Sequence, residues 1–368
     1  MVSNPRIAIV GAGLGGLMLA RMLYLKDVPF LIFDRDESLS HRPQGGMLDL
    51  HVETGQYALR LGGLFDVFQQ FARYEDQGLR LFDQHGTLLL EKADAASGER
   101  PEIDRGQLRE LLLESIPEDT LRWGHTLRAA EQQDDGYIEL HFDNGLKQRF
   151  ELVVGADGAW SKVRALVSAT EPTFTGLTLH EVSIPDADAR HPDVAHQVGH
   201  GMLIAKGKRK TIFAQRNANA RIRVYAGLYH QATPHEAKTR GDLLHDFQDW
   251  DASLLQLLQV ADEPVRPWPV HVLPIEHRWE HRTGVTLLGD AAHLMPPAGE
   301  GANLALRDAV DLADALLDER DWKAAVRAHE QVMFERAALA AAEAHKMMMA
   351  DSPEENLERM KSQLGAEA

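Results

Sequence analysis

The chain of 368 residues has no cysteine, far fewer basic than acidic residues, and no apolar run long enough to cross a bilayer. The absence of cysteine excludes disulfides, thiolate catalysis and cysteine-ligated metals, and it is consistent with the reducing cytoplasm. The net charge of −17 argues against nucleic acid and anionic membranes as partners, because both require clustered positive charge. We expect a cytoplasmic globular protein.

Motifs of several enzyme classes are also missing. The chain has neither the G-x-S-x-G elbow of hydrolases nor a G-x-x-x-x-G-K-[ST] phosphate loop. His191, His196 and His200 lie in a polar segment without an H-E-x-x-H pattern, so we expect no metal site. The basic run over residues 206–210 is typical of a solvated hairpin turn.

The N-terminal residues predict a strand, a helix and a second strand. Arg6–Val10 is short and apolar, Leu14–Leu25 has the composition of a buried helix, and Phe30–Phe33 is apolar again and ends at Asp34. Three such elements within about 30 residues are typical of a βαβ unit in a parallel sheet.

The turn between the first strand and the helix has the G-x-G-x-x-G spacing of dinucleotide-binding folds. Gly11 would make the tight turn, Gly13 would let the backbone approach a pyrophosphate, and Gly16 would let the helix pack on the strand. Asp34, about 20 residues further on, is placed to bind a ribose hydroxyl. On this motif alone, FAD and NAD are equally compatible.

Periodicity outlines the rest of the chain. Apolar residues alternate with polar ones from Ile138 to Phe142 and from Ile222 to Leu228, which predicts half-buried antiparallel strands. Further elements are predicted as a hairpin over 79–90 and helices over Thr54–Gln70, Arg105–Ser115, Arg240–Gln259 and Trp322–Met349. We expect a discontinuous dinucleotide-binding domain (1–172 and 269–320), an inserted domain with an antiparallel sheet (173–268), a bridging helix (321–350) and an acidic tail (351–368).

Two further motifs follow predicted strands. "GADGAWSKVR" occupies residues 155–164, and "GDAAHLMPPAGEGAN" begins at Gly289. With the N-terminal motif they resemble, in order, the three signatures of class A flavoprotein monooxygenases of the p-hydroxybenzoate hydroxylase type. "GGMLDLH" and "EIDRGQLRELLLESI" look like the tetracycline-inactivating members of that family. The resemblance implies an α/β fold with a Rossmann-like FAD-binding domain, an inserted α+β substrate domain and a long C-terminal helix.

The resemblance also implies roles for single positions. Asp34 and Arg35 would contact the adenosine half of FAD, and Asp290 its ribityl chain or pyrophosphate. Arg42 would contact NADPH, and Asp157 belongs to a motif tied to both FAD and NAD(P)H. The remaining cofactor positions are Arg105 at the ribityl–phosphate region, Asp49 near the flavin ring, and Pro297, Gly301, Ala302 and Asn303 at the helix terminus beneath the ring. A helix N-terminus at that place would stabilise the negative charge of a reduced flavin.

The chemistry implied by the family is carried by the cofactor, and no catalytic side chain is expected. NAD(P)H would reduce FAD, and dioxygen would then give a flavin hydroperoxide that hydroxylates a small aromatic or polycyclic substrate. Substrate contacts are expected from the inserted domain and the proline pair, at Phe174, Glu181, Phe213, Arg216, Tyr225 and Pro296. A single FAD-centred core predicts a monomer.

The segment after the proline pair departs from the family pattern. Only Ala298 separates Pro297 from the G-x-G, where two residues are usual, and Glu300 stands where glutamine is usual. Glu181 occupies a position where the tetracycline-inactivating type has a substrate-contacting glutamine, and Gly201 falls nearest its substrate-binding arginine. These differences argue against tetracycline as the substrate more than they argue against monooxygenation.

Two other functions use the same motifs. The first is a flavoprotein reductase, oxidase or halogenase, although the W-x-W-x-I-P pattern of the halogenases is absent. The second is a non-catalytic flavoprotein that binds a ligand and reports redox state. Incorporation of labelled dioxygen and substrate-stimulated NAD(P)H consumption distinguish both from a monooxygenase.

Overall fold

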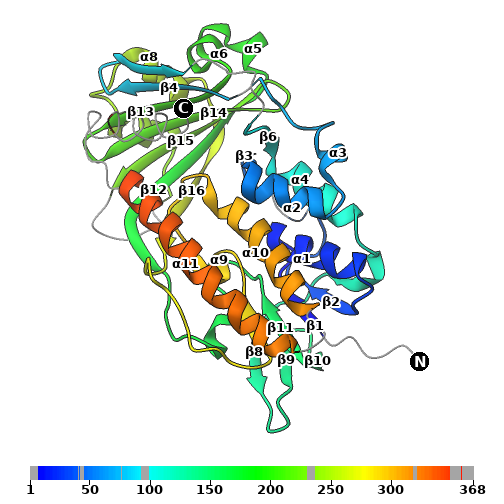
Figure 1. Cartoon of the computed structure of the whole chain (residues 1–368). Helices are drawn as coiled ribbons and strands as arrows, with labels where there is room; N and C mark the ends of the chain where they lie inside the picture. The colour runs from blue at the N-terminus through cyan, green and yellow to red at the C-terminus, as the bar shows by residue number, and fades with distance from the viewer. Residues whose placement is uncertain are drawn as a thin grey trace.

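The computed structural model describes residues 7–39, 41, 45–75, 77–92, 99–229, 237–317, 321–348 and 358. One part of the molecule is built on a parallel sheet and another on a large, mostly antiparallel sheet (Figure 1). The long helix α11 (Trp322–Met348) runs beside the first part and ends close to the second, where the Tyr229 hydroxyl donates to the Met348 carbonyl. This architecture confirms the predicted α/β fold with its long C-terminal helix.

The parallel sheet has β1 (Ile7–Val10) at its centre. Its order is β17 (Val285–Leu287), β11 (Leu152–Gly155), β1, β2 (Phe30–Phe33) and β7 (Leu121–Arg122), and each neighbouring pair is parallel. Ile7 and Ile9 belong to the core on one face, and Ala8 and Val10 to the core on the other. Burial on both faces explains the continuous apolar run of β1.

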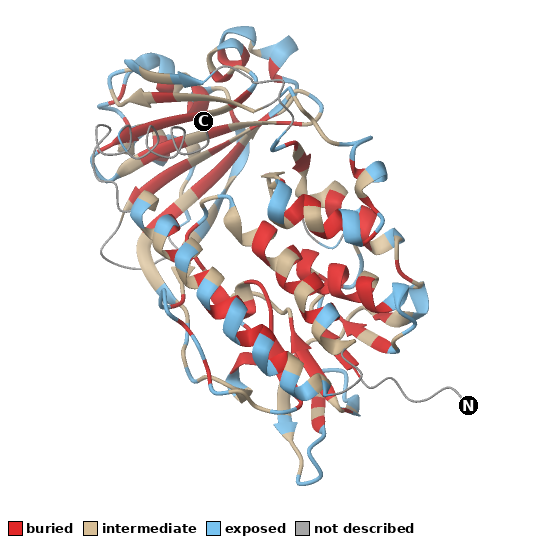
Figure 2. Cartoon of the chain, in the orientation of Figure 1, coloured by how far each residue is buried: buried red, intermediate tan, exposed pale blue. Residues whose placement is uncertain are grey.

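The first face of this sheet carries helices that position the candidate site. They are α1 (Leu14–Leu25), α4 (Arg105–Glu114) and α10 (Glu300–Leu316). The opposite face is covered by a three-stranded sheet of β8 (Leu127–Gln132), β9 (Ile138–Phe142) and β10 (Lys147–Phe150), together with Met333 and Phe334 of α11. Figure 2 shows the buried residues concentrated on these inner faces. Shorter turns complete this part, with η2 at Glu118–Thr120, η3 at Arg164–Leu166 and α9 at Asp290–His293.

The seven-stranded sheet separates an apolar core from a more polar face. Its order is β16 (Asp262–Val272), β12 (Thr173–Ile184), β15 (Arg221–Tyr229), β14 (Lys210–Asn217), β13 (Gly201–Gly207), β4 (Gly78–Asp83) and β5 (Leu88–Lys92). The alternating apolar residues from Ile222 to Leu228 are all buried in one core with α5 (Ala187–Arg190), α6 (Pro192–Val198), α7 (Arg240–Asp246) and α8 (Ala252–Gln259). The predicted half-buried strand is therefore confirmed.

Two predicted helices are interrupted. The segment predicted as Thr54–Gln70 consists of a π-helical turn, η1 (Val52–Gln56), and two short helices, α2 (Tyr57–Leu61) and α3 (Phe65–Phe68). The break lies at two glycines, and Gly63 has a φ of +67° that ends the helix. The segment predicted as Arg240–Gln259 is α7 and α8, because Asp251 starts a new helix by accepting a hydrogen bond from the Ser253 N–H.

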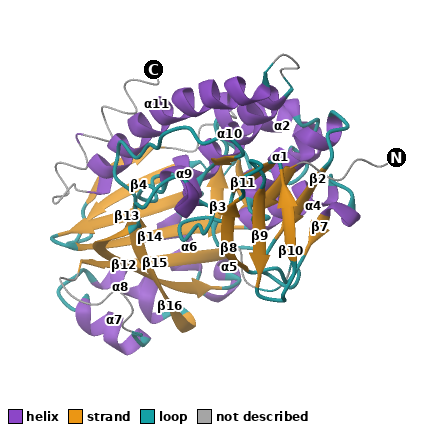
Figure 3. Cartoon of the chain, turned by 90° about the horizontal axis from the view of Figure 1, so that it is seen from below, coloured by secondary structure: helices purple, strands orange, loops and turns teal. Residues whose placement is uncertain are grey.

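The seven-stranded sheet contains strands from both predicted domains. Strands β4 and β5 lie within residues 1–172, yet β4 pairs in parallel with β13. The domain boundaries stay a prediction, and the tail over 351–368 lies outside the described residues except for Glu358. Figure 3 shows α10 and α11 packed together along one side of the molecule. Within the described parts of the chain, no helix is both long and apolar enough to cross a membrane.

Candidate cofactor and substrate site

The three glycines of the N-terminal motif have different surroundings in the folded chain. A Cβ at Gly11 would overlap the Ala156 carbonyl, and one at Gly16 would overlap the Gly11 carbonyl. A Cβ at Gly13, the N-cap residue of α1, would meet no described atom within 4 Å. Open space beside first-turn N–H groups suits a phosphate, because those groups have no acceptor within their own helix. The predicted pyrophosphate contact at Gly13 fits this space.

Asp34 ties this turn to the end of β2. Its Oδ2 accepts from the Ala12 N–H at 2.6 Å and its Oδ1 from the Asp36 N–H at 2.8 Å. The carboxylate is therefore engaged in shaping the turn, and the ribose contact stays a prediction. Arg35, the other residue expected at the adenosine half, is exposed beside it.

Arg109 on α4 is a site residue that the sequence reading missed. Its Nε donates to the Ala12 carbonyl at 2.8 Å, and its Nη2 lies 3.8 Å from Asp34 and 3.5 Å from Asp36. The sequence held a signal for it, because Arg109 follows Leu108 and precedes Leu112 by three residues, on the apolar side of the predicted helix. A cation at such a position calls for buried acidic partners.

Close contacts at glycines connect the glycine-rich turn with α10 and with the segment that begins at Gly289. A Cβ at Gly289 would lie 2.9 Å from Ala305 Cβ, and one at Gly15 would lie 2.9 Å from the Ala305 carbonyl. A Cβ at Gly301 would lie 3.8 Å from Asp290 Oδ1. The glycine-rich turn, Asp290 and the first turn of α10 thus form one strip, as an extended dinucleotide requires. This strip fits an extended dinucleotide such as FAD, and the positions of the phosphates at α1 and of the ring at Gly301 and Ala302 stay predictions.

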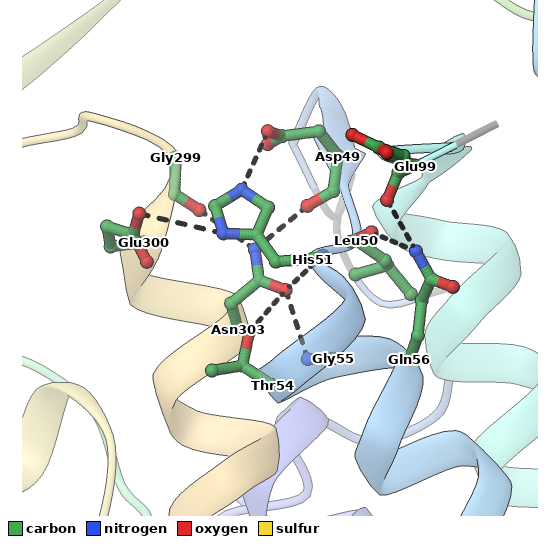
Figure 4. A network of polar contacts seen from close by, with 10 residues as sticks. All are labelled: Asp49, Leu50, His51, Thr54, Gly55, Gln56, Glu99, Gly299, Glu300 and Asn303. Atoms are coloured by element: carbon green, nitrogen blue, oxygen red, sulfur yellow. Dashed lines mark hydrogen bonds and ion pairs between the residues drawn. The ribbon is translucent and has the colours of Figure 1, made fainter. Parts of the chain in front are cut away.

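Asn303 connects the first turn of α10 to β3 and η1, at the end of the strip where the flavin ring is predicted, called here the ring end (Figure 4). Its Nδ2 donates to the Asp49 carbonyl at 2.8 Å, and its Oδ1 accepts from the N–H groups of His51 at 3.0 Å and Gly55 at 3.2 Å. The side chain is fully buried. Its hydrogen bonds therefore connect η1 and β3 (Met47–Asp49) to α10. Its predicted contact with FAD stays a prediction.

Asp49, His51 and Glu300 meet beside this anchor (Figure 4). His51 Nε2 lies 2.9 Å from Asp49 Oδ2, and His51 Nδ1 lies 3.6 Å from Glu300 Oε1. Gly299 precedes the helix with a φ of +93°, and a Cβ there would lie 3.4 Å from Asp49 Oδ1. The prediction that Asp49 lies at the ring end is consistent with this position. The proline pair leads into it, with Pro296 buried and Pro297 exposed.

Arg105 lies on the other side of the same loop. It begins α4, which follows β6 (Glu102–Asp104), the partner strand of β3. Its backbone N–H donates to the Gly46 carbonyl at 3.0 Å, and its Cδ lies 3.7 Å from the position of a Cβ on Gly45. Its contact with the ribityl–phosphate region stays a prediction. Arg42 lies outside the described residues.

Three of the predicted substrate residues share the polar face of the large sheet. Tyr225 pairs with both Glu181 and Phe213, and directly opposed residues on neighbouring strands point to the same side. The Tyr225 hydroxyl lies 2.9 Å from the position of a Cβ on Gly46, so β3 brings this face up to the ring end. Phe174 lies farther along β12, where it packs on the His271 ring.

Arg216 is a correction to the predicted substrate set. It pairs with Ile222, whose side chain belongs to the apolar core on the opposite face of the sheet. Its guanidinium donates to Asp188 at 2.7 and 3.1 Å and to the Gly199 carbonyl. Arg216 therefore lies away from the Tyr225 face, in a surface groove of about 530 Å³ beneath α6.

Glu181 organises the face that carries Tyr225. The buried carboxylate accepts from Arg223 Nη1 at 2.8 Å and from Trp268 Nε1 at 2.9 Å. Burial and the charge of Glu181 raise the pKa of Tyr225 to about 12, so its hydroxyl is a neutral donor. Arg223 and Trp268 were not predicted; Arg223 could have been found because it alternates with the apolar residues of its strand.

The second motif forms a closed turn after β11. Asp157 Oδ2 accepts from the N–H groups of Lys162 at 2.7 Å and Val163 at 3.4 Å, and burial raises the pKa of Asp157. Arg164, also missed, reaches the Ala291 carbonyl at 3.0 Å and so links this turn to the Gly289 segment. The role of Asp157 toward FAD and NAD(P)H stays a prediction.

A buried ion network supports the strip from behind. Asp308 Oδ2 accepts from the Gly289 N–H at 3.1 Å and contacts His293 Nε2 at 2.6 Å, while its Oδ1 accepts from Arg336 of α11 at 2.9 Å. Side chains of histidine, aspartate and glutamate are nowhere grouped as metal ligands in the described part of the chain.

Comparison with known proteins agrees with this geometry. The family profile "FAD binding domain" matches residues 5–346. "Monooxygenase asqM" of Emericella nidulans is 32% identical over 85% of this chain and 84% of its own length, and "Monooxygenase penA" of Penicillium thymicola is 30% identical over 85% of each. The resemblance therefore extends to fungal monooxygenases.

Solved structures show the same fold. Klebsiella pneumoniae HpxO, complexed with FAD and uric acid, superposes with a TM-score of 0.78 at 20% identity, covering 92% of this chain and 87% of that one. Tetracycline destructase Tet(55) superposes with a TM-score of 0.77 at 22% identity over 99% and 96% of the two chains. That likeness shows a shared fold and does not establish the closer kinship that the motifs suggested. The chain belongs to the FAD-binding-domain family and is an FAD-dependent monooxygenase.

Proposed function

We propose that this monooxygenase hydroxylates an electron-rich aromatic or polycyclic small molecule with NAD(P)H as reductant. The overall reaction takes substrate, NAD(P)H, a proton and dioxygen to hydroxylated substrate, NAD(P)⁺ and water. One observation carries the proposal: β3 lies between the Tyr225 face of the large sheet and the first turn of α10. Bound FAD would supply hydride acceptance and dioxygen activation, and the chain would bind, orient and exclude water.

The face of the large sheet that carries Tyr225 suits an aromatic ring with a polar substituent. Phe213 offers an apolar surface, and Tyr225 offers a hydroxyl that stays protonated. Glu181 and Arg223 neutralise one another at 2.8 Å, so neither is expected to bind a substrate charge by itself. A few fixed polar groups in a mainly apolar cavity are typical of small-molecule sites.

The test is a panel of polycyclic phenols, with tetracyclines and uric acid included. We expect purified protein to hold yellow FAD and at least one compound to stimulate NAD(P)H consumption, with one atom of ¹⁸O from labelled dioxygen in the product. Protein that stays colourless after FAD is supplied would contradict the proposal. Labelled hydrogen peroxide without labelled product would instead indicate an oxidase.

The same assay identifies the reductant, and a separate measurement gives the oligomeric state. NADH and NADPH are compared at equal concentration, since either fits the sequence motifs. We expect a monomer, measured by light scattering during gel filtration, because one chain supplies both the FAD strip and the substrate face.

A further inference from the structure

Two opposite charges lie side by side on the face of the large sheet that is proposed to hold the substrate. We infer that Glu181 is a specificity-determining residue: by neutralising the Arg223 guanidinium, it makes the substrate site favour an uncharged aromatic ring over an anionic one, such as a carboxylated phenol. The inference rests on the proposed function and names the charge class of its substrate.

Both charged groups are on the same side of the sheet as Tyr225. Glu181 is directly opposite Tyr225 on the neighbouring strand, and Arg223 precedes Tyr225 by two residues on its own strand. The Glu181 carboxylate accepts from Arg223 Nη1 at 2.8 Å, and the two side chains are 5% and 17% exposed. Because the pair is largely buried, water and salt screen these charges only weakly.

The other partners of Glu181 hold its carboxylate in place beside Arg223. Trp268 Nε1 donates to Oε2 at 2.9 Å, and Nη1 of the half-exposed Arg266 lies 3.9 Å from Oε1. Each carboxylate oxygen thus has a close donor. A guanidinium is always charged, so the carboxylate compensates a permanent cation on this face.

Both charges act at the Tyr225 hydroxyl. Burial and the charge of Glu181 raise the pKa of Tyr225 to about 12, and the Arg223 guanidinium opposes that rise. The hydroxyl lies 2.9 Å from the position of a Cβ on Gly46, and Arg223 Cδ lies 3.8 Å from the same position. A ring bound beside Tyr225 is therefore close to both charges, whose effects on it have opposite signs.

Removal of the carboxylate alone would change this balance. Arg223 would then present an uncompensated cation to the site, and a guanidinium binds a carboxylate through charge-assisted hydrogen bonds. Two further cations are nearby: Lys206, whose ammonium lies 5.7 Å from the centre of the Phe213 ring, and Arg105, which adjoins Gly45. They are the same in every variant described below, so they cannot produce a difference between variants.

The experiment compares two probes of nearly the same shape, a hydroxynaphthoate and its uncharged amide. Their dissociation constants for FAD-loaded protein are measured from flavin absorbance without NAD(P)H, so that no turnover occurs. We expect wild type to bind the amide more tightly than the carboxylate. In Glu181→Gln, the affinity for the carboxylate relative to the amide should increase about tenfold, and the added substitution Arg223→Gln should reverse this increase.

Asp262→Asn is the matched control. It removes one carboxylate from a half-exposed position on β16, where Asp262 is opposite Ser183 and lies 3.5 Å from Arg190, so the relative affinity should stay that of wild type. Arg223→Gln alone should weaken binding of the carboxylate relative to the amide by about tenfold. This variant tests the inference with the opposite sign, even if Glu181→Gln does not fold.

The inference would be overturned if Glu181→Gln and Asp262→Asn had the same relative affinity, or if the increase persisted in the double variant. Failure of either probe to bind any of these proteins would also overturn it. Failure of the proposed function appears elsewhere, as wild-type protein without FAD or without labelled product from the whole panel of compounds. Normal hydroxylation with an unchanged relative affinity would contradict this inference alone.

Discussion

Asp308 on α10 and His293 on α9 form a buried ion pair in which Oδ2 lies 2.6 Å from Nε2. The same Oδ2 accepts from the Gly289 N–H, and Oδ1 accepts from Arg336. One carboxylate therefore connects the Gly289 segment, α10 and α11 behind the proposed FAD strip.

The first prediction concerns the loss of this carboxylate. Asp308→Asn leaves the His293 and Arg336 cations without their buried partner, so we expect the free energy of unfolding to fall by about 3–5 kcal/mol. Chemical denaturation of the FAD-free protein measures it. Asp311→Asn is the matched control, because Asp311 also pairs with Arg336 but is more exposed. Equal losses in the two variants would refute the special role of Asp308.

The pair also predicts a pH dependence of stability. Burial opposes both charges, but the mutual attraction prevails: the pKa of His293 is raised above 6.5, and the pKa of Asp308 is lowered below 3.8. Stabilisation from His293 is complete below 6.5 and is lost as the pH rises through its folded pKa; that from Asp308 is complete above 3.8 and is lost as the pH falls.

Denaturation of wild type and Asp308→Asn at a series of pH values tests this expectation. The difference in free energy of unfolding should be largest between about pH 4 and 6.5 and should shrink on both sides. A difference that does not vary with pH would show that the pair does not titrate as inferred.

The glycine-rich turn predicts opposite effects for two similar substitutions. An alanine at Gly13 meets open space and needs no unusual φ, so the melting temperature of the FAD-free protein should stay the same or rise slightly. The affinity for FAD should fall. Gly16→Ala would overlap the Gly11 carbonyl and should lower the melting temperature. Scanning calorimetry and FAD titration separate the two effects. Unchanged FAD affinity in Gly13→Ala would place the pyrophosphate elsewhere.

Asp290 is expected to contact FAD between its phosphates and its ring. Asp290→Ala removes one charge-assisted hydrogen bond, so the FAD dissociation constant should increase by an amount equal to about 1.5–3 kcal/mol. The fold should persist, because the side chain is only partly buried. Fluorescence titration measures the affinity, with Glu53→Ala as control. An unaltered dissociation constant would mean that Asp290 does not face the cofactor.

Tyr225 is expected to act on the substrate and not on FAD. Because its pKa is raised to about 12, the hydroxyl stays protonated throughout the range in which the enzyme can be assayed. Tyr225→Phe should raise the substrate KM about threefold to tenfold, as expected for one neutral hydrogen bond. The FAD dissociation constant and the pH profile between 6 and about 9 should not change. A changed FAD affinity would assign Tyr225 to the cofactor site.

Much of the fold could be predicted because local pattern and burial agree. The strand–glycine–helix–strand order at the N-terminus and the alternation from Ile222 to Leu228 follow from the neighbours of each residue along the chain. The three motifs in their order resemble those of a flavoprotein family, and that resemblance pointed to FAD. Asp34, Asp290 and Gly301 accordingly lie along one strip.

Relations between distant segments were not readable from the sequence. The face occupied by Arg216 and the pairing of β4 with β13 depend on register and packing against other elements. Asn303 was expected at a helix terminus, but its hydrogen bonds to residues about 250 positions earlier appear only in the folded chain. The sequence by itself determined which chemistry-bearing residues are present and which local elements carry them. Only the tertiary structure decided that Glu300 meets His51, because that contact depends on how α10 packs against η1.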